Sequence, residues 1–90
     1  MQLDETIRAL LAHTDKSGRA VSQELGHSPD WARMAARPGQ VPSLGTVADV
    51  ADVAGVDVAL VDRETGETLG TIEPPRRARQ AQHSDEAQQD

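Results

Sequence analysis

The chain has no cysteine, and Trp31 is the only aromatic residue among its 90 amino acids. Without cysteine there is no disulfide framework and no thiolate metal site, as is usual in a reducing cytoplasm. Without phenylalanine or tyrosine, the core has to be built from Leu, Val, Ile and Ala, and small side chains let helices approach closely. No apolar run reaches the roughly 20 residues of a membrane span, and the first residues do not read as a signal peptide. We therefore expect one small, soluble, cytoplasmic domain.

Positive charge is also scarce, because nine Lys and Arg face fifteen Asp and Glu and the formal net charge is −6. A domain that binds nucleic acid is expected to carry a basic patch. The imbalance, however, lies in the C-terminal half. Residues 1–45 hold five bases and five acids, whereas residues 46–90 hold four arginines and ten acids. A molecule polarised in this way can present its neutral end to phosphates and keep its acidic end away from them.

Two segments show the spacing of amphipathic helices. In residues 3–13 the large apolar side chains recur at i, i+4, i+7 and i+8, which places them on one helical face. The stretch from Leu44 to Ala54 has a similar apolar face, and Ser43 precedes it as an N-cap. Asp49 and Asp52 lie off that apolar face, so we expect them on the outer surface of the helix.

Two shorter helical patterns, at residues 18–25 and 29–37, meet at a corner formed by Leu-Gly-His-Ser. Gly26 can end the first helix in a left-handed conformation. Ser28 is predicted to cap the second helix, and Pro29 suits the first helical position because its missing N–H would have no partner there. The two patterns together predict a helix-turn-helix.

The predicted helix 29–37 has two different faces. One face carries alanines, and the other carries three charged residues, Asp30, Arg33 and Arg37. Trp31 and Met34 are expected to supply the packing volume that alanines lack, which favours a partly buried tryptophan. The charged face remains free for solvent or for a partner.

The sequence pattern changes after residue 55. Apolar residues alternate in 56–61, and a second extended segment follows at 67–72, with Gly66 in the turn between them. This predicts a β-hairpin over residues 56–73. Because an isolated two-stranded hairpin is only marginally stable, we expect it to pack on the helices or to pair with the hairpin of a second subunit in a homodimer.

Residues 74–90 contain no large apolar side chain and are predicted to be disordered. Three arginines lie at the start of this tail, at positions 76, 77 and 79. Such a basic run is usually solvated, although it could also contact phosphates or an acidic partner.

A set of spacings in residues 3–55 is typical of one family. Val21 and Leu25 are four apart, Gly26 follows, Ala32 lies six residues after that glycine, and Pro-Ser-Leu precedes the next helix. In these features the chain resembles the lambda-repressor/Cro (XRE-like) helix-turn-helix domains. The resemblance implies a mostly α fold, with a four-helix DNA-binding domain in residues 1–55, the hairpin 56–73 as a dimerisation element, and the tail 74–90.

The resemblance also implies that helix 29–37 enters the major groove of double-stranded DNA. Arg33 is the first candidate for reading a base, because a guanidinium can bind guanine O6 and N7 as a fork. Arg19 and Arg37 are candidates for phosphate contacts, with the hydroxyl of Ser28 or N–H groups near it. Asp30 either favours the helix dipole or accepts from cytosine N4. Each arginine could instead be ordinary surface charge.

We therefore expect a sequence-specific transcriptional regulator, a repressor or autoregulator that reads a pseudo-palindromic operator as a homodimer. The alternative is a protein-interaction module that reuses the fold, with a protein partner for the acidic C-terminal half. The sequence shows no nucleophile motif, phosphate-binding glycine loop, carboxylate pair or cluster of metal ligands. We therefore expect neither enzymatic activity nor a metal or cofactor.

Overall fold

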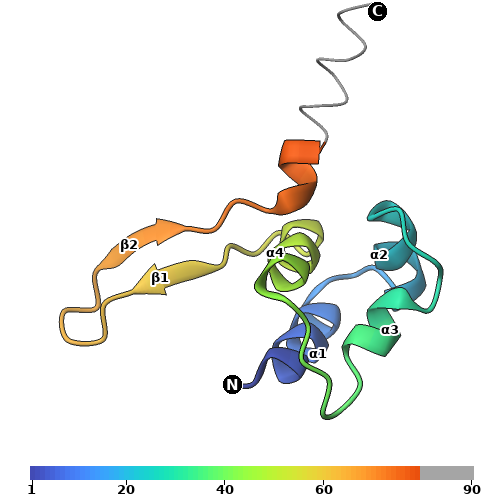
Figure 1. Ribbon diagram of the computed structural model, residues 1–90, viewed down its shortest axis with the longest axis horizontal. Coiled ribbons are helices and arrows are strands. Elements are labelled where there is room, and N and C mark those ends of the chain that lie inside the picture. The colour runs from blue at the N-terminus through green and yellow to red at the C-terminus, as the bar shows by residue number, and fades with distance from the viewer. Residues whose placement is uncertain (80–90) are drawn as a thin grey trace, which may run out of the picture.

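The computed structural model describes residues 1–79, and this part of the chain is mostly helical (Figure 1). The elements, in order, are α1 (Leu3–His13), α2 (Gly18–Glu24), α3 (Trp31–Ala35), α4 (Leu44–Val53), β1 (Ala59–Val61), β2 (Thr68–Thr71) and a short helix at 75–79. The expected combination of helices and a C-terminal hairpin is confirmed. Among residues 1–79, no helix is both long and apolar enough to cross a membrane.

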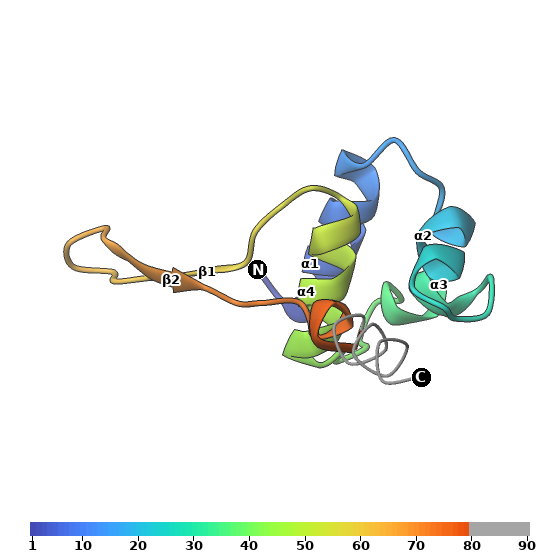
Figure 2. The same cartoon turned by 90° about the horizontal axis from the view of Figure 1, so that it is seen from above.

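The core is built around α4, which is buried on almost every side. Val47, Val50 and Val53 of α4 pack with side chains of the other three helices, namely Ile7, Leu10, Val21 and Ala32, and with Ala36 at the end of α3. α1 lies along α4, and the α2–α3 pair lies beside them, on the side away from the hairpin (Figures 1 and 2). The small alanines of α3 bury little area, so the core gains most of its hydrophobic stabilisation from Ile, Leu and Val.

The ends of α1 and α4 agree with the predicted ones to within a residue. Ser43 is the N-cap of α4, and its Oγ accepts a hydrogen bond from the Thr46 N–H at 3.1 Å. Gly55 follows the end of α4 with φ of 74°. A left-handed residue at this place stops a helix, and glycine adopts it without a steric cost.

The hairpin forms an arm that extends away from the helices (Figure 2). β1 and β2 pair antiparallel, with Ala59 opposite Thr71 and Leu60 opposite Gly70, and Gly66 occupies the turn with φ of 76°. Every residue of both strands is exposed. The arm packs against the core only near its base, through Val56 and Val58. One of our two expectations was that the hairpin packs on the helices. This is wrong for the strands themselves, which do not lie on the helices.

The prediction that disorder begins at residue 74 is wrong for residues 74–79. Pro74 is buried and the helix 75–79 packs on α4, while residues 80–90 lie outside the described part of the chain. Proline is favourable at the first position of a helix, and Pro75 occupies that place. Pro75 also lies over Gly45 of α4, where an added Cβ would meet its Cγ at 3.2 Å.

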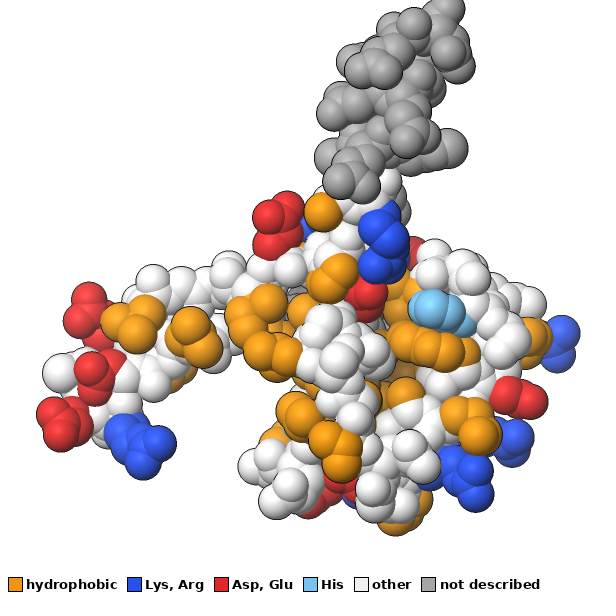
Figure 3. All heavy atoms as spheres, in the orientation of Figure 1, with side chains coloured by type: hydrophobic (Ala, Val, Ile, Leu, Met, Phe, Trp, Pro, Cys, Tyr) orange, Lys and Arg blue, Asp and Glu red, His pale blue; other side chains and the backbone are white. Residues whose placement is uncertain are grey.

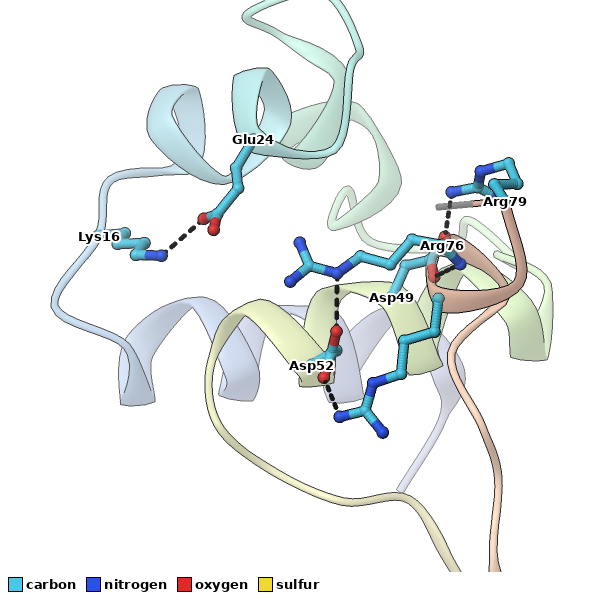
Figure 4. Close-up of polar contacts among 7 residues, drawn as sticks. Lys16, Glu24, Asp49, Asp52, Arg76 and Arg79 are labelled. Atoms are coloured by element: carbon cyan, nitrogen blue, oxygen red, sulfur yellow. Dashed lines mark hydrogen bonds and ion pairs between the residues drawn. The ribbon is translucent and has the colours of Figure 1, made fainter. Parts of the chain in front are cut away.

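Two carboxylates of α4 hold this short helix in place (Figure 4). Asp52 accepts from Nε of Arg76 at 2.7 Å and from Nη2 of Arg77 at 2.6 Å. Asp49 accepts from the Arg76 backbone N–H at 2.9 Å and from Nη2 of Arg79 at 3.1 Å. We call these five residues the arginine latch. The expectation that Asp49 and Asp52 lie on an outer surface is therefore wrong, since the returning chain covers them.

The latch determines the ionisation of Asp52. Burial raises the pKa of this carboxyl, but the hydrogen bonds and positive charges of Arg77 and Arg76 outweigh that effect and leave its pKa below the ordinary value. The latch therefore ties the C-terminal end of the hairpin to α4 by charge-assisted hydrogen bonds.

Candidate nucleic-acid interface

The corner between α2 and α3 begins at Gly26, which has φ of 81° as its predicted role requires. The Gly26 N–H donates to the Gln23 carbonyl at 3.0 Å, and the His27 N–H donates to the Ser22 carbonyl at 2.9 Å. These bonds satisfy carbonyls at the end of α2 while the chain reverses. The direction of α3 relative to α2 is thereby set by backbone geometry.

Ser22 locks the two helices together. Its hydroxyl is fully buried, donates to the Gly18 carbonyl at 2.7 Å and accepts from the Ala32 N–H of α3 at 2.9 Å. Ala32 is the second residue of α3, so its N–H is one of those that a helix leaves without an internal partner. A side chain of α2 thus supplies the cap for α3.

The predicted helix 29–37 is correspondingly shorter, and its predicted cap is wrong. The Ser28 carbonyl accepts from the Trp31 N–H at 3.0 Å, which makes residues 28–31 a turn, and α3 begins only at Trp31 after Asp30. The Ser28 side chain is exposed and caps no amide within residues 1–79, because the Trp31 N–H, three residues on, already donates to the Ser28 carbonyl. Local sequence suggested Ser28, whereas tertiary packing selects Ser22.

Replacing Ser22 with alanine is expected to lower the free energy of unfolding by about 1–3 kcal/mol, because the buried Ala32 N–H would lose its acceptor. Chemical denaturation followed through the fluorescence of Trp31 measures this loss. Ser28→Ala is the matched control, since that hydroxyl is exposed, and it should change stability by less than about 0.5 kcal/mol. Equal stabilities for the two variants would contradict the capping role of Ser22.

The outer side of α3 brings two of the candidate residues together. Arg33, Met34 and Arg37 line an open hollow of about 340 Å³. Met34 is 47% exposed, so the expectation that it fills the core is wrong. Arg19 is exposed on α2, and Ser28 and Asp30 are exposed in the turn before α3.

Acidic side chains pair with two of the basic side chains of this surface. Arg33 and Asp30 form an ion pair at 3.5 Å, but their side chains are 77% and 73% exposed. Lys16 and Glu24 pair at 2.6 Å beside α2 (Figure 4). Exposed pairs of this kind contribute little energy, so a phosphate or a base could replace Asp30 as the partner of Arg33 at low cost.

A second polar cluster, which we call the Asp4 cluster, holds the C-terminal end of α3. It was not predicted from the sequence. Nη1 of Arg8 on α1 donates to the Ala36 carbonyl at 2.6 Å and to Oδ2 of Asp4 at 3.2 Å. The same Asp4 oxygen accepts from the Gly39 N–H at 3.1 Å. The bond from Gly39, with help from Arg8 and against burial, holds the pKa of Asp4 below its ordinary value.

Trp31 is partly buried, as predicted, and it stacks against a neighbour that we did not single out. The rings of His27 and Trp31 lie 4.1 Å apart and within 11° of parallel. Beside them is a hollow of about 470 Å³ between the corner, the start of α4 and the helix 75–79. Trp31 therefore packs on the side of α3 away from the hollow formed by Arg33 and Arg37, and the latter keeps its access to solvent.

In residues 1–79, no three His, Cys, Asp or Glu side chains gather in a way that could hold a metal ion. No protein-family model matches the chain, and neither a curated protein nor a solved structure is significantly similar to it.

Proposed function

We propose that this chain is a sequence-specific DNA-binding regulator of the lambda-repressor-like type, with α3 inserted in the major groove. The observation that carries the proposal is the α2–α3 corner. A left-handed glycine and the bond between Ser22 and Ala32 hold α3 rigidly. Its outer side carries Arg33, and Arg37, two residues after its end, lines the same hollow. A helix whose inner side is held by the rest of the chain and whose outer side is exposed to solvent is suited to enter a groove of DNA.

In this proposal Arg33 reads a base and the other basic residues position the protein. The Arg33 guanidinium would leave Asp30 and bind guanine O6 and N7, while Arg19 and Arg37 would contact phosphates. The hydroxyl of Ser28 is exposed and caps no amide within residues 1–79, so a phosphate could bind it. Asp30 could keep its ion pair with Arg33 or accept from cytosine N4.

Few positive charges serve this surface, so each subunit should bind weakly and a homodimer should bind much better. The exposed hairpin is suited to join two subunits, and a twofold axis would place two α3 helices on a pseudo-palindromic operator. The regulator would act as a repressor where its operator overlaps a promoter.

Selection of genomic fragments by the purified chain at low salt tests the proposal. The expected result is enrichment of a small set of fragments that share an inverted repeat, with half-sites about one helical turn apart. If no sequence is enriched, the corner does not read DNA. The better reading would then be a protein-interaction module that uses the acidic C-terminal half.

Arg19→Ala and Arg37→Ala are expected to weaken binding about equally on all DNA sequences. Each lost phosphate contact should also reduce the slope of log K against log salt concentration by about 1. Fluorescence anisotropy titrations at several salt concentrations, on the selected operator and on a scrambled duplex, measure both effects. An unchanged salt slope in both variants would remove these two arginines from the interface.

A further inference from the structure

Among residues 1–79 the hairpin is a two-stranded sheet, so the backbone groups along its two outer edges pair with no other described strand. Open edges of this kind are templates for intermolecular pairing. Leu60, Val61 and Leu69 of the hairpin are all more than half exposed, and hydrophobic side chains are visible along the arm, with charged ones at its tip (Figure 3). The two edges differ in the regularity of their backbone and in their charges, and these differences indicate which edge is better suited to pairing.

The backbone groups along the outer edge of β1 are regularly spaced. The Val58 carbonyl accepts from the Ile72 N–H at 2.8 Å, and the Asp62 N–H donates to the Glu67 carbonyl at 2.8 Å, so residues 58 and 62 direct their polar backbone groups toward β2. These groups alternate in direction along an antiparallel strand. Residues 57, 59 and 61 therefore direct their N–H and C=O groups outward, and Arg63 begins the turn that follows Asp62.

The outer edge of β2 is less suitable. The pairing shifts between Leu60 opposite Gly70 and Val61 opposite Thr68, so Leu69 is an extra residue that bulges β2. Two copies of β2 paired antiparallel about Gly70 would also bring Glu67 of each opposite Glu73 of the other. Directly opposed like charges destabilise a sheet, and bulges protect an edge from pairing.

We propose that two copies of this chain pair antiparallel through the outer edge of β1, with the two Leu60 residues facing each other at the twofold axis. In that register Ala59 pairs with Val61 of the partner subunit, so the outward backbone groups of both meet. The same register brings Asp57 beside Arg63 of the partner subunit, the first residue of the turn, which places opposite charges at both ends of the four-stranded sheet. Only the role of this dimer rests on the proposed function: in a DNA-binding regulator, the pairing would set the spacing of the two half-sites.

A charge exchange tests the register without DNA. In D57R the two ends of the sheet would carry opposed arginines, and in R63D they would carry opposed aspartates. Each variant alone should self-associate at least about tenfold more weakly than the wild type. An equimolar mixture should recover dimers, because both ends of a mixed dimer again join opposite charges. Sedimentation equilibrium of the full chain measures all three samples.

A proline pair identifies the edge. A59P removes an outward N–H of β1 and should weaken self-association about tenfold or more, whereas T71P removes an outward N–H of β2 and should not. A wild type that is monomeric at about 1 mM, or a mixture that associates no better than its components, would overturn the proposal. A monomer that still selects an operator would leave DNA recognition intact, and a recovered mixed dimer without any selected DNA would refute the proposed function alone.

Discussion

Arg33→Ala is expected to abolish the preference of this protein for its operator while leaving weak, non-specific binding to DNA. One bidentate contact with guanine contributes about 1–3 kcal/mol of discrimination, and a symmetric operator doubles it to about 2–6 kcal/mol. The guanidinium is free to make this contact, since it is 77% exposed and its pair with Asp30 spans 3.5 Å.

Arg33→Lys is the matched control for this experiment. Lysine keeps the charge but loses the rigid fork of donors. Affinity for a scrambled duplex should therefore stay within a few-fold of the wild type in the lysine variant, while discrimination between operator and scrambled duplex falls in both variants. Undiminished discrimination in Arg33→Ala would show that Arg33 is only a surface charge.

Removal of the arginine latch is expected to have the second large effect. The double variant Asp49→Ala with Asp52→Ala should lose about 2–3 kcal/mol of stability, because four charge-assisted hydrogen bonds to the segment 76–79 disappear. Urea denaturation measures the loss. Amide hydrogen exchange at Arg76 should also become fast, since its N–H would no longer be bonded to Asp49.

Glu24→Ala is the control for the latch, because the Lys16–Glu24 pair is about as short as the pairs of Asp52, whereas the Glu24 side chain is 39% exposed and that of Asp52 only 12%. It should cost less than about 0.5 kcal/mol. A double variant as stable as the wild type, with slow exchange at Arg76, would mean that Pro75 and the apolar contacts hold the helix 75–79 without the carboxylates.

The latch and the Asp4 cluster also predict how stability depends on pH. The native pKa values of Asp52 and Asp4 lie below their ordinary values. The unfolded chain therefore binds more protons as the pH falls through about 4, and the stabilisation by these two carboxylates is present above that pH and lost below it. Unfolding free energies measured from pH 7 to pH 3 should accordingly converge for the wild type and the Asp52→Ala variant.

Local sequence patterns predict the helices and the turns of this chain well. The apolar spacing of α1 and α4, the cap at Ser43 and the left-handed glycines at 26, 55 and 66 depend on a few neighbouring residues. The exact start of α3 was not predictable in this way, because its cap is the side chain of Ser22, ten residues upstream. A serine that faces the inside of an amphipathic helix was the only available signal.

The arginine latch was not predictable either, because its contacts also join residues that are far apart in the sequence. Asp52 and Arg76 are 24 residues apart, and the segment after Pro74 has no large apolar side chain that would predict a packed helix. The signal was indirect: α4 is apolar on nearly every side, so two acidic residues on it required partners. The Asp4 cluster similarly joins α1 to the residues after α3 across a distance of up to 35 residues in sequence.

The most direct test of the central claim, that α3 reads the major groove, is methylation interference on the selected operator. Methylation of guanine N7 modifies the major groove, and methylation of adenine N3 modifies the minor groove. We predict that one methylated guanine in each half-site blocks binding by the wild type and has no effect on the residual binding of Arg33→Ala. Interference confined to adenine N3, or to no base at all, would contradict the placement of α3 in the major groove.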